Sequence, residues 1–152
     1  MTAIAGKTDS HENSLLLLIF NNTTYAKIGD ATGIVGSTVP GSLYVSLHTA
    51  DPTEEGVQNT NECTYTSYLR VAKARSGAGW TVTGGSVVPA SAITFPAGTG
   101  GAGTATFFGV GCSTIAGGAA DPLLYAGAIS PSIVTGNGIT PQLSTATAIT
   151  ES

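Results

Sequence analysis

The chain has 152 residues, of which 41% are hydrophobic and 9% charged, and its formal net charge is −4. This length fits one domain with a single core, and high hydrophobicity with few charges excludes an intrinsically disordered chain. With only five Lys and Arg residues, the chain lacks the basic surface that nucleic-acid binders place against phosphates, so we expect no direct nucleic-acid partner.

Residues 1–42 are predicted to form an N-terminal arm, a short apolar segment and a loop. Residues 1–13 are polar without periodicity, which predicts an extended arm. The apolar run at 15–20 follows Ser14, which can cap a helix, and ends at two asparagines, which favours a short helix. A buried strand is the competing interpretation, because six residues do not separate the two periodicities. The run is too short for a signal peptide or a membrane span, so we expect no membrane partner.

Residues 43–152 are predicted to form an all-β domain, an antiparallel β-sandwich or jelly roll of about eight strands. In the first strand, residues 43–48, apolar residues alternate with Tyr44, Ser46 and His48. Between residues 76 and 150 the only charged residue is Asp121, and Gly-Gly, Pro and Asp-Pro turns separate short apolar segments. The further strands are predicted at residues 65–75, 80–83, 93–95, 104–110, 123–129, 138–143 and 146–149.

Two sequence patterns resemble cofactor or catalytic motifs. Residues 98–103 have the glycine spacing of a dinucleotide-binding fingerprint, but a β-type segment follows where that fingerprint needs a helix. We therefore predict a flexible turn. Ser46, His48 and Asp51 supply the residue types of a hydrolase triad, but no nucleophile elbow precedes the serine. We expect His48 to be a hydrogen-bonding residue at a strand end, and the protein not to be an enzyme.

Metal and disulfide chemistry have weak support in the sequence. Cys63, Cys112 and the two histidines lack metal-ligand spacing, and we expect both cysteines to be small packed side chains without a disulfide. Four acids can offer oxygen ligands to a hard cation, namely Asp51, Glu54, Glu55 and Glu62. These acids lack an EF-hand register, so we prefer a solvated loop and expect no metal or cofactor.

The basic residues are concentrated in one short segment. Arg70, Lys73 and Arg75 are three of the five basic residues of an acidic protein. One interpretation is an exposed strand edge that charge protects from aggregation. The other is a patch that docks on an acidic protein surface. The sequence leaves both open.

Several blocks of sequence resemble a group of small virion proteins of tailed bacteriophages, often labelled tail fibre proteins. The resemblance spans residues 43–151 and implies a β-rich virion component without enzymatic activity or cofactor. The sequence departs from the group at residues 15–20, which are nearly all apolar where the group often has a more charged helix. The blocks that carry the resemblance are LYVSLHTADP at 43–52 with the acidic loop after it, YTSYLRVA at 65–72, ITFP at 93–96, TFFGV at 106–110 and LLYAG at 123–127.

Two positions in a phage particle fit this resemblance. The favoured one is a capsid cement or decoration protein on the outer capsid surface, assembled in the host cytoplasm. It would bind the major capsid protein through many weak contacts as a homotrimer or dimer. A small domain without coiled coil, collagen repeat or fibrous period makes a poor fibre shaft. The alternative is a tail or tail-fibre component that binds a receptor, with sugar-stacking aromatics. Those aromatics are Tyr44, Tyr68, Trp80 and Tyr125, although aromatics in strands usually belong to the core.

The residues predicted to bind a partner fall into two groups. The first would form a clamp on the capsid shell together with the N-terminal arm, and the second would make electrostatic contacts. The clamp residues are Leu15, Leu16, Leu18 and Phe20, and the electrostatic residues are Arg70, Lys73 and Arg75.

Overall fold

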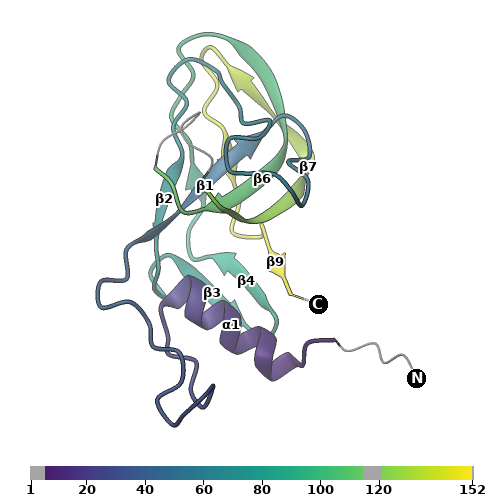
Figure 1. The fold of residues 1–152 in the computed structure, drawn as a ribbon. Helices are drawn as coiled ribbons and strands as arrows, with labels where there is room; N and C mark the ends of the chain where they lie inside the picture. The colour runs from purple at the N-terminus through teal and green to yellow at the C-terminus, as the bar shows by residue number, and fades with distance from the viewer. Residues whose placement is uncertain (1–5, 115–120, 152) are drawn as a thin grey trace, which may run out of the picture. The chain divides into compact units, whose positions relative to one another are not determined.

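The computed structural model describes residues 6–114 and 121–151, and this part of the chain forms one helix and nine strands (Figure 1). The strand pairs at 44–48 with 107–111, 80–83 with 86–89, 86–87 with 149–150, 93–94 with 142–143 and 102–111 with 123–136 are antiparallel. The predicted all-β class with an N-terminal helix is therefore confirmed. The elements are α1 (Asp9–Asn21), β1 (Ser42–His48), β2 (Val71–Ala74), β3 (Trp80–Thr83), β4 (Ser86–Pro89), β5 (Ile93–Thr94), β6 (Ala102–Gly111), β7 (Leu123–Gly136), β8 (Gln142–Leu143) and β9 (Ile149–Thr150).

The chain divides into two compact units. The first comprises Met1–Gly41, Ala74–Ser91 and Thr145–Ser152, and the second comprises Ser42–Lys73 and Ala92–Ser144. The first unit contains α1 and the three-stranded sheet β3-β4-β9, and the second contains most of the four-stranded sheet β2-β1-β6-β7 together with the pair β5-β8.

Helix α1 starts earlier than the sequence predicted. It begins at Asp9, after the extended residue Thr8, whose carbonyl accepts the amides of His11 and Glu12. Residues 9–13 are thus helical rather than part of an extended arm, and Ser14 lies inside the helix; the predicted arm at residues 1–5 falls outside the described residues. Asp9 and Glu12 place negative charge in the first turn, where it interacts favourably with the positive end of the helix dipole, and this stabilises a helix that begins at Asp9. The short apolar segment is therefore a helix and not a strand.

The first unit is built around an aromatic contact between α1 and β3. Phe20 and Trp80 are both buried, with ring centroids 4.8 Å apart at 69°, an edge-to-face arrangement that aromatic pairs favour. Leu16, one turn before Phe20 on the same helix face, is fully buried, as is Val87 of β4. The spacing of Leu16 and Phe20 therefore determines which face of α1 joins the core.

The second unit depends on β1, which is buried on both faces from Val45 onward. Leu47 of β1 pairs with Phe108 of β6, and on the far side of β6 Phe108 pairs with Gly127 of β7. The register between β6 and β7 shifts twice, between Ala105 and Phe107 and between Val110 and Gly111. The outer strands of this sheet are the long strand β7 on one side and the short strand β2 on the other.

Each predicted strand overlaps an observed one, but one prediction is wrong in part and one observed strand was not predicted. The strand predicted at 65–75 is wrong over its first part, because Ser67 has a positive φ of 78° and the amide of Tyr68 donates to the carbonyl of Tyr65, which makes a turn. Only Val71–Ala74 is a strand there. Strand β4 was not predicted, since it ends in a proline and directly follows two glycines. The described residues include no helix with the length and apolar character needed to cross a membrane.

Candidate functional site

The segment between β1 and β2, residues 49–70, is fastened in the second unit by a buried ion pair. Arg70 donates from Nε and Nη2 to the two carboxylate oxygens of Glu62 at 2.7 and 2.8 Å. The Arg70 side chain is 0% exposed and that of Glu62 is 3% exposed. Arg70 also donates to the carbonyl of Ser113 at 3.2 Å. A bidentate pair enclosed in this way fixes the geometry of the segment, because breaking it would leave an uncompensated buried charge.

Tyr68 links this ion pair to the sheet. Its hydroxyl donates to Glu62 Oε1 at 3.0 Å and accepts the amide of Leu47 in β1 at 2.9 Å. Burial is the main reason that the pKa of Tyr68 lies well above its usual range, and the nearby Glu62 carboxylate raises the pKa further. The phenol therefore stays protonated and keeps donating to Glu62.

Ser46 and His48 come together as the residue types of a hydrolase do, but in a sealed position. Ser46 Oγ lies 2.9 Å from His48 Nε2, and both residues are fully buried. His48 Nδ1 lies 2.7 Å from the carbonyl of Thr60, so a backbone oxygen occupies the place of the orienting carboxylate. Asp51 instead accepts the amide of Thr53. The prediction of His48 as a hydrogen-bonding strand-end residue is confirmed.

Two glycines of β6 leave room for neighbouring side chains, one for His48 of β1 and the other for Gln58 of the 49–70 segment. A Cβ on Gly109 would stand 2.6 Å from His48 Nε2, and a Cβ on Gly111 would stand 2.3 Å from Gln58 Oε1. Gln58 is fully buried, donates to the carbonyl of Tyr44 at 2.7 Å and accepts the amide of Ser113 at 3.1 Å. Glycine at these positions is therefore explained by the close approach of other side chains.

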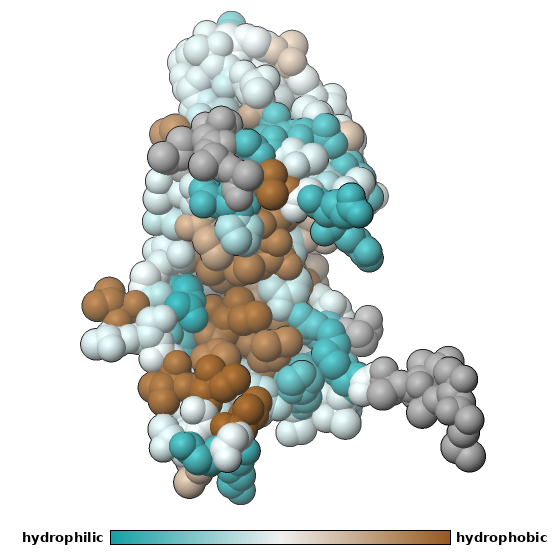
Figure 2. Space-filling view, viewed as in Figure 1, coloured by the Kyte–Doolittle hydropathy of each residue, from teal (hydrophilic) through white to brown (hydrophobic). Residues whose placement is uncertain are grey.

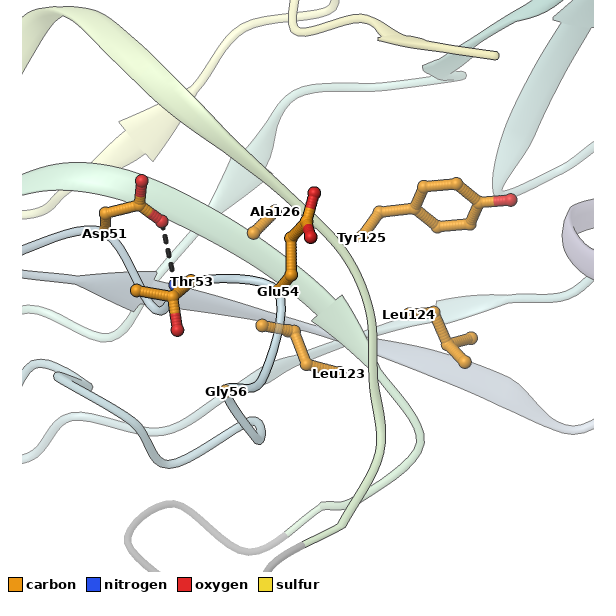
Figure 3. A pocket seen from close by; sticks show the side chains of 8 residues that line it. All are labelled: Asp51, Thr53, Glu54, Gly56, Leu123, Leu124, Tyr125 and Ala126. Atoms are coloured by element: carbon orange, nitrogen blue, oxygen red, sulfur yellow. Dashed lines mark hydrogen bonds between the residues drawn. The ribbon is translucent and has the colours of Figure 1, made fainter. Parts of the chain in front are cut away.

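The same segment forms one wall of a pocket of about 420 Å³ in the second unit. Asp51, Thr53, Glu54 and Gly56 face four consecutive residues of β7, Leu123 to Ala126 (Figure 3). Because neighbouring strand residues point to opposite faces, four consecutive lining residues mean that the pocket also meets the strand backbone. The lining residues carry two carboxylates and two hydroxyls, from Asp51, Glu54, Thr53 and Tyr125, groups that can accept hydrogen bonds from a cationic or hydroxyl-bearing group.

The pocket wall is held in shape by local hydrogen bonds. Asp51 Oδ1 accepts the amide of Thr53 at 2.8 Å, and its carbonyl accepts from the side-chain amide of Asn61 at 2.9 Å. A Cβ on Gly56 would lie 1.9 Å from the carbonyl oxygen of Pro52, so a larger residue does not fit in this turn. The two carboxylates at the pocket are thus presented by an ordered loop.

The four acids considered as cation ligands do not form one site. Asp51 and Glu54 line the pocket, Glu55 is exposed outside its lining, and Glu62 is enclosed with Arg70. In the described ranges no three acidic, His or Cys residues are grouped as metal ligands. The solvated-loop interpretation therefore holds for the first three acids and is wrong for Glu62, whose burial depends on a partner in the fold.

The three clustered basic residues are not displayed as one exposed patch. Arg70 is in the buried ion pair, so the expectation that it lies on an exposed edge is wrong. Lys73 is half-buried on β2. Arg75 belongs to the first unit, where it donates to the carbonyls of Leu18 and Ile19 at 2.9 and 2.7 Å, at the end of α1.

The four helix residues proposed as a clamp also differ in how far they are buried. Leu16 and Phe20 are fully buried, so they are core residues in this structure and are not presented to a capsid shell. Leu15 and Leu18 are half-buried, and their role as clamp residues stays a prediction.

Two of the four proposed sugar-stacking aromatics are also in the core. Tyr68 and Trp80 are 8% and 2% exposed, so neither offers a ring face to a ligand. Tyr44 and Tyr125 are half-buried, and Tyr125 lines the pocket. A stacking role therefore stays a prediction for these two residues only.

The predicted turn at 98–103 ends at Gly101, which has a φ of +76°, because Ala102 and Gly103 already belong to β6; a strand and not a helix follows the glycines. Cys63 and Cys112 are both free. Cys63 is buried as expected, but Cys112 is exposed, so the expectation of a packed side chain is wrong for Cys112. Burial raises the pKa of the Cys63 thiol to about 11, which keeps it protonated near neutral pH.

A second surface lies in the connection between α1 and β1. The side chain of Asn22 donates to the carbonyl of Ser37 at 2.8 Å and accepts its amide at 2.7 Å, which closes this connection into an ordered loop. Figure 2 shows hydrophobic side chains protruding at the left of the view, where this connection runs in Figure 1. Its exposed aliphatic residues are Ile28, Ile34, Val35 and Val39.

The sequence did not identify the role of Gln58 or the pocket. In the sequence, Gln58 is one of several polar residues in a loop. It is buried because Gly111 of β6, far away in the sequence, leaves space for its side chain. The pocket joins two segments that were interpreted separately, an acidic loop and a charge-free strand.

Comparison with known proteins identifies the family. Residues 6–147, most of the chain, match the family described as podophage GP4 fiber I protein gp80. No match was found among curated proteins. The match agrees with the resemblance of residues 43–151 to small phage virion proteins, and it extends that resemblance into α1. The chain therefore belongs to the podophage GP4 fiber I protein gp80 family, a family of phage fibre proteins and hence of virion components.

Proposed function

We propose that this protein is a structural component of a fibre on the phage particle. The observation that carries the proposal is the family match over residues 6–147, whose description is that of a fibre protein. This reverses the order of the two positions weighed from the sequence, in which a capsid cement protein stood first and a tail-fibre component second.

The structure supports a non-enzymatic role. The histidine and serine that most resemble a catalytic pair are both fully buried, and the histidine is oriented by a backbone carbonyl. The uppermost part of Figure 2 is mostly pale, and residues 76–150, which include β6 and β7, have Asp121 as their one charged residue. A charge-poor β surface of this kind suits packing against other protein chains.

The proposal is tested by locating the protein on intact particles. Antibodies raised against the purified chain, detected with gold in electron micrographs, should label projecting fibres. The ratio of this chain to the major capsid protein, measured by quantitative mass spectrometry, should be small, since a particle has few fibres and many shell subunits.

Antibodies against the major capsid protein serve as the matched control and should label the shell. Gold distributed evenly over the head, with copy numbers close to those of the major capsid protein, would contradict the fibre proposal and favour the cement protein. Gold on fibres together with a low copy ratio supports it.

A further inference from the structure

The segment that runs beside β7 pairs with this part of the sheet at one point only. Val57 forms an antiparallel bridge with Pro122. An antiparallel ladder that continued from this bridge would place residues 53–56 opposite residues 123–126. Within the described ranges that ladder does not continue, and both stretches instead line the pocket of about 420 Å³ (Figure 3). The pocket therefore lies where a strand beside β7 would run.

The pocket is at the outer edge of the sheet, because its lining residues come from β7 and the 49–70 segment and none from β6. Next to it, residues 125–128 pair in continuous register with residues 107–110 of β6, so the backbone of β7 is regular there. An outer strand presents N–H and C=O groups with which a further strand can pair, and charge is what usually deters such pairing. The 14 residues of β7 include no Asp, Glu, Lys or Arg. An extended peptide can therefore be added beside β7 on the pocket side.

Two carboxylates determine which charge such a peptide should carry. Asp51 and Glu54 line the pocket, and the amide of Thr53 donates to Asp51 Oδ1 at 2.8 Å, which keeps that carboxylate in an ordered turn. In the part of the chain that the structure describes, neither carboxylate forms an ion pair. A lysine or arginine of the added peptide would supply the opposite charge, and an arginine can donate to both oxygens of a carboxylate.

A second copy of this chain offers no such peptide. The chain has five Lys and Arg residues in all. Lys27 lies in a turn with a positive φ of 69°, which is not an extended conformation. The other four already interact within the chain: Lys7 with Glu151, Arg70 with Glu62, Arg75 with backbone carbonyls, and Lys73. Charge complementarity therefore favours a peptide from a different protein.

We propose that the pocket beside β7 is a docking site for an extended peptide segment of another protein, with a lysine or arginine whose side chain contacts Asp51 and Glu54. The peptide pairs through its backbone with β7 at residues 123–126. In strand addition of this kind the backbone pairing supplies affinity and the side-chain pocket supplies specificity. The inference rests on the proposed function only in that a fibre component is joined to other proteins of the particle.

The test titrates the purified, isotope-labelled full chain with a synthetic peptide and follows the amide signals of the protein by NMR. The peptide is acetylated and amidated and has the sequence Thr-Val-Arg-Val-Thr, whose β-branched residues favour an extended conformation. At millimolar peptide, the signals of residues 51–57 and 123–128 should shift. Added salt should weaken binding, because it screens exposed charges. A peptide with glutamine in place of arginine should bind about fivefold more weakly or worse, since it lacks the charge-assisted hydrogen bonds.

Variants of the chain test the two carboxylates. Asp51→Asn and Glu54→Gln keep an oxygen acceptor of similar shape, so the turn at Thr53 should persist. The double variant should bind the arginine peptide as weakly as the wild type binds the glutamine peptide. Glu55→Gln is the matched control, because Glu55 is exposed and outside the pocket lining, and it should bind as the wild type does. The amide spectrum shows first that each variant is folded, and each single variant serves if the double variant is not.

Two N-methylated forms of the arginine peptide test the backbone pairing. Neighbouring residues of an extended strand direct their N–H groups to opposite sides. A methyl group on the arginine nitrogen and one on the nitrogen of the following valine therefore block opposite edges of the peptide. One form should lose most of its binding, and the other should keep it.

Four results would overturn the proposal: no shifts in the two stretches, equal binding of the arginine and glutamine peptides, equal binding of the two N-methylated forms, or binding of free arginine amide as strong as that of the peptide. Calcium chloride or methyl glucoside that shifts the same signals more strongly would assign the pocket to a metal ion or a sugar instead. Because the test uses the chain in solution, its failure is distinct from a failure to find the protein on fibres.

Discussion

The two long connections on either side of β1 are both fastened by an arginine, but in opposite ways. Residues 49–70 are held in the second unit by Arg70, which is enclosed with a carboxylate. Residues 22–41 are held in the first unit by Arg75, which donates to backbone carbonyls including that of Pro40 at 3.1 Å. The 49–70 connection buries Gln58, Glu62 and Arg70, whereas the 22–41 connection exposes four aliphatic side chains. The position of an arginine next to a β-strand in the sequence therefore does not predict whether its side chain is buried in an ion pair or hydrogen-bonded to backbone carbonyls.

The largest expected effect comes from breaking the buried ion pair. Arg70→Met leaves the Glu62 carboxylate buried without its cation, so the free energy of unfolding should fall by about 3–5 kcal/mol. Urea unfolding followed by circular dichroism measures this loss. The double variant Arg70→Met/Glu62→Leu removes both charges and should recover most of the stability. A loss below about 1 kcal/mol for the single variant, typical of an exposed pair, would mean that the 49–70 segment is not fastened in this way.

The next effect tests how closely the side chains of β1 pack against the backbone of β6. In Gly109→Ala the new Cβ would stand 2.6 Å from His48 Nε2 and 2.9 Å from Ser46 Oγ, so neighbouring groups must shift. We expect a loss of about 1–3 kcal/mol, as for other overpacked cores. Gly77→Ala is the matched control, because a Cβ there meets nothing within 4 Å. Equal unfolding free energies for the two variants would contradict the close packing at Gly109.

Arg75 should contribute less than Arg70, because its partners are neutral carbonyls. Arg75→Gln removes the charged donors to Leu18, Ile19 and Pro40, and we expect a loss of about 1–2 kcal/mol. Hydrogen exchange should accelerate at the end of α1 and in residues 22–41. Faster exchange in residues 49–70 instead would show that the two connections are not fastened independently.

The smallest effect is a dependence on pH. Burial lowers the pKa of His48 below its ordinary value of 6.5, despite the opposing influence of the Thr60 carbonyl and Glu62. The unfolded chain therefore binds a proton more readily than the folded one, so stability is complete above about pH 6.5 and falls as the pH drops toward the folded pKa. In His48→Gln this part of the slope should disappear from unfolding free energies measured between pH 7 and 5. An unchanged slope would assign the acid sensitivity to other groups.

Local patterns in the sequence were enough to predict most of the strands. The alternation in residues 43–48 and the punctuated segments near 93, 106 and 123 each correspond to an observed strand. The prediction of a strand failed at 65–70, because the backbone turns at Ser67 and leaves Leu69 58% exposed.

The environment of charged residues was harder to predict, because it depends on tertiary contacts. Glu62 and Arg70 lie in an irregular segment with no periodicity, so nothing local indicates that they pair in the interior. The pocket likewise combines Asp51 and Glu54 with the β7 strand, and only the fold brings these segments together. The sequence therefore indicated residues of the candidate site, but not which of them lie next to one another in the fold.

A reconstruction of the intact phage particle by electron cryomicroscopy tests the central claim most directly. The account predicts that density matching the separate units of this chain, including the β2-β1-β6-β7 sheet, lies in fibres that project from the particle. Density for these units spread over the outer capsid lattice, with none in the fibres, would contradict it.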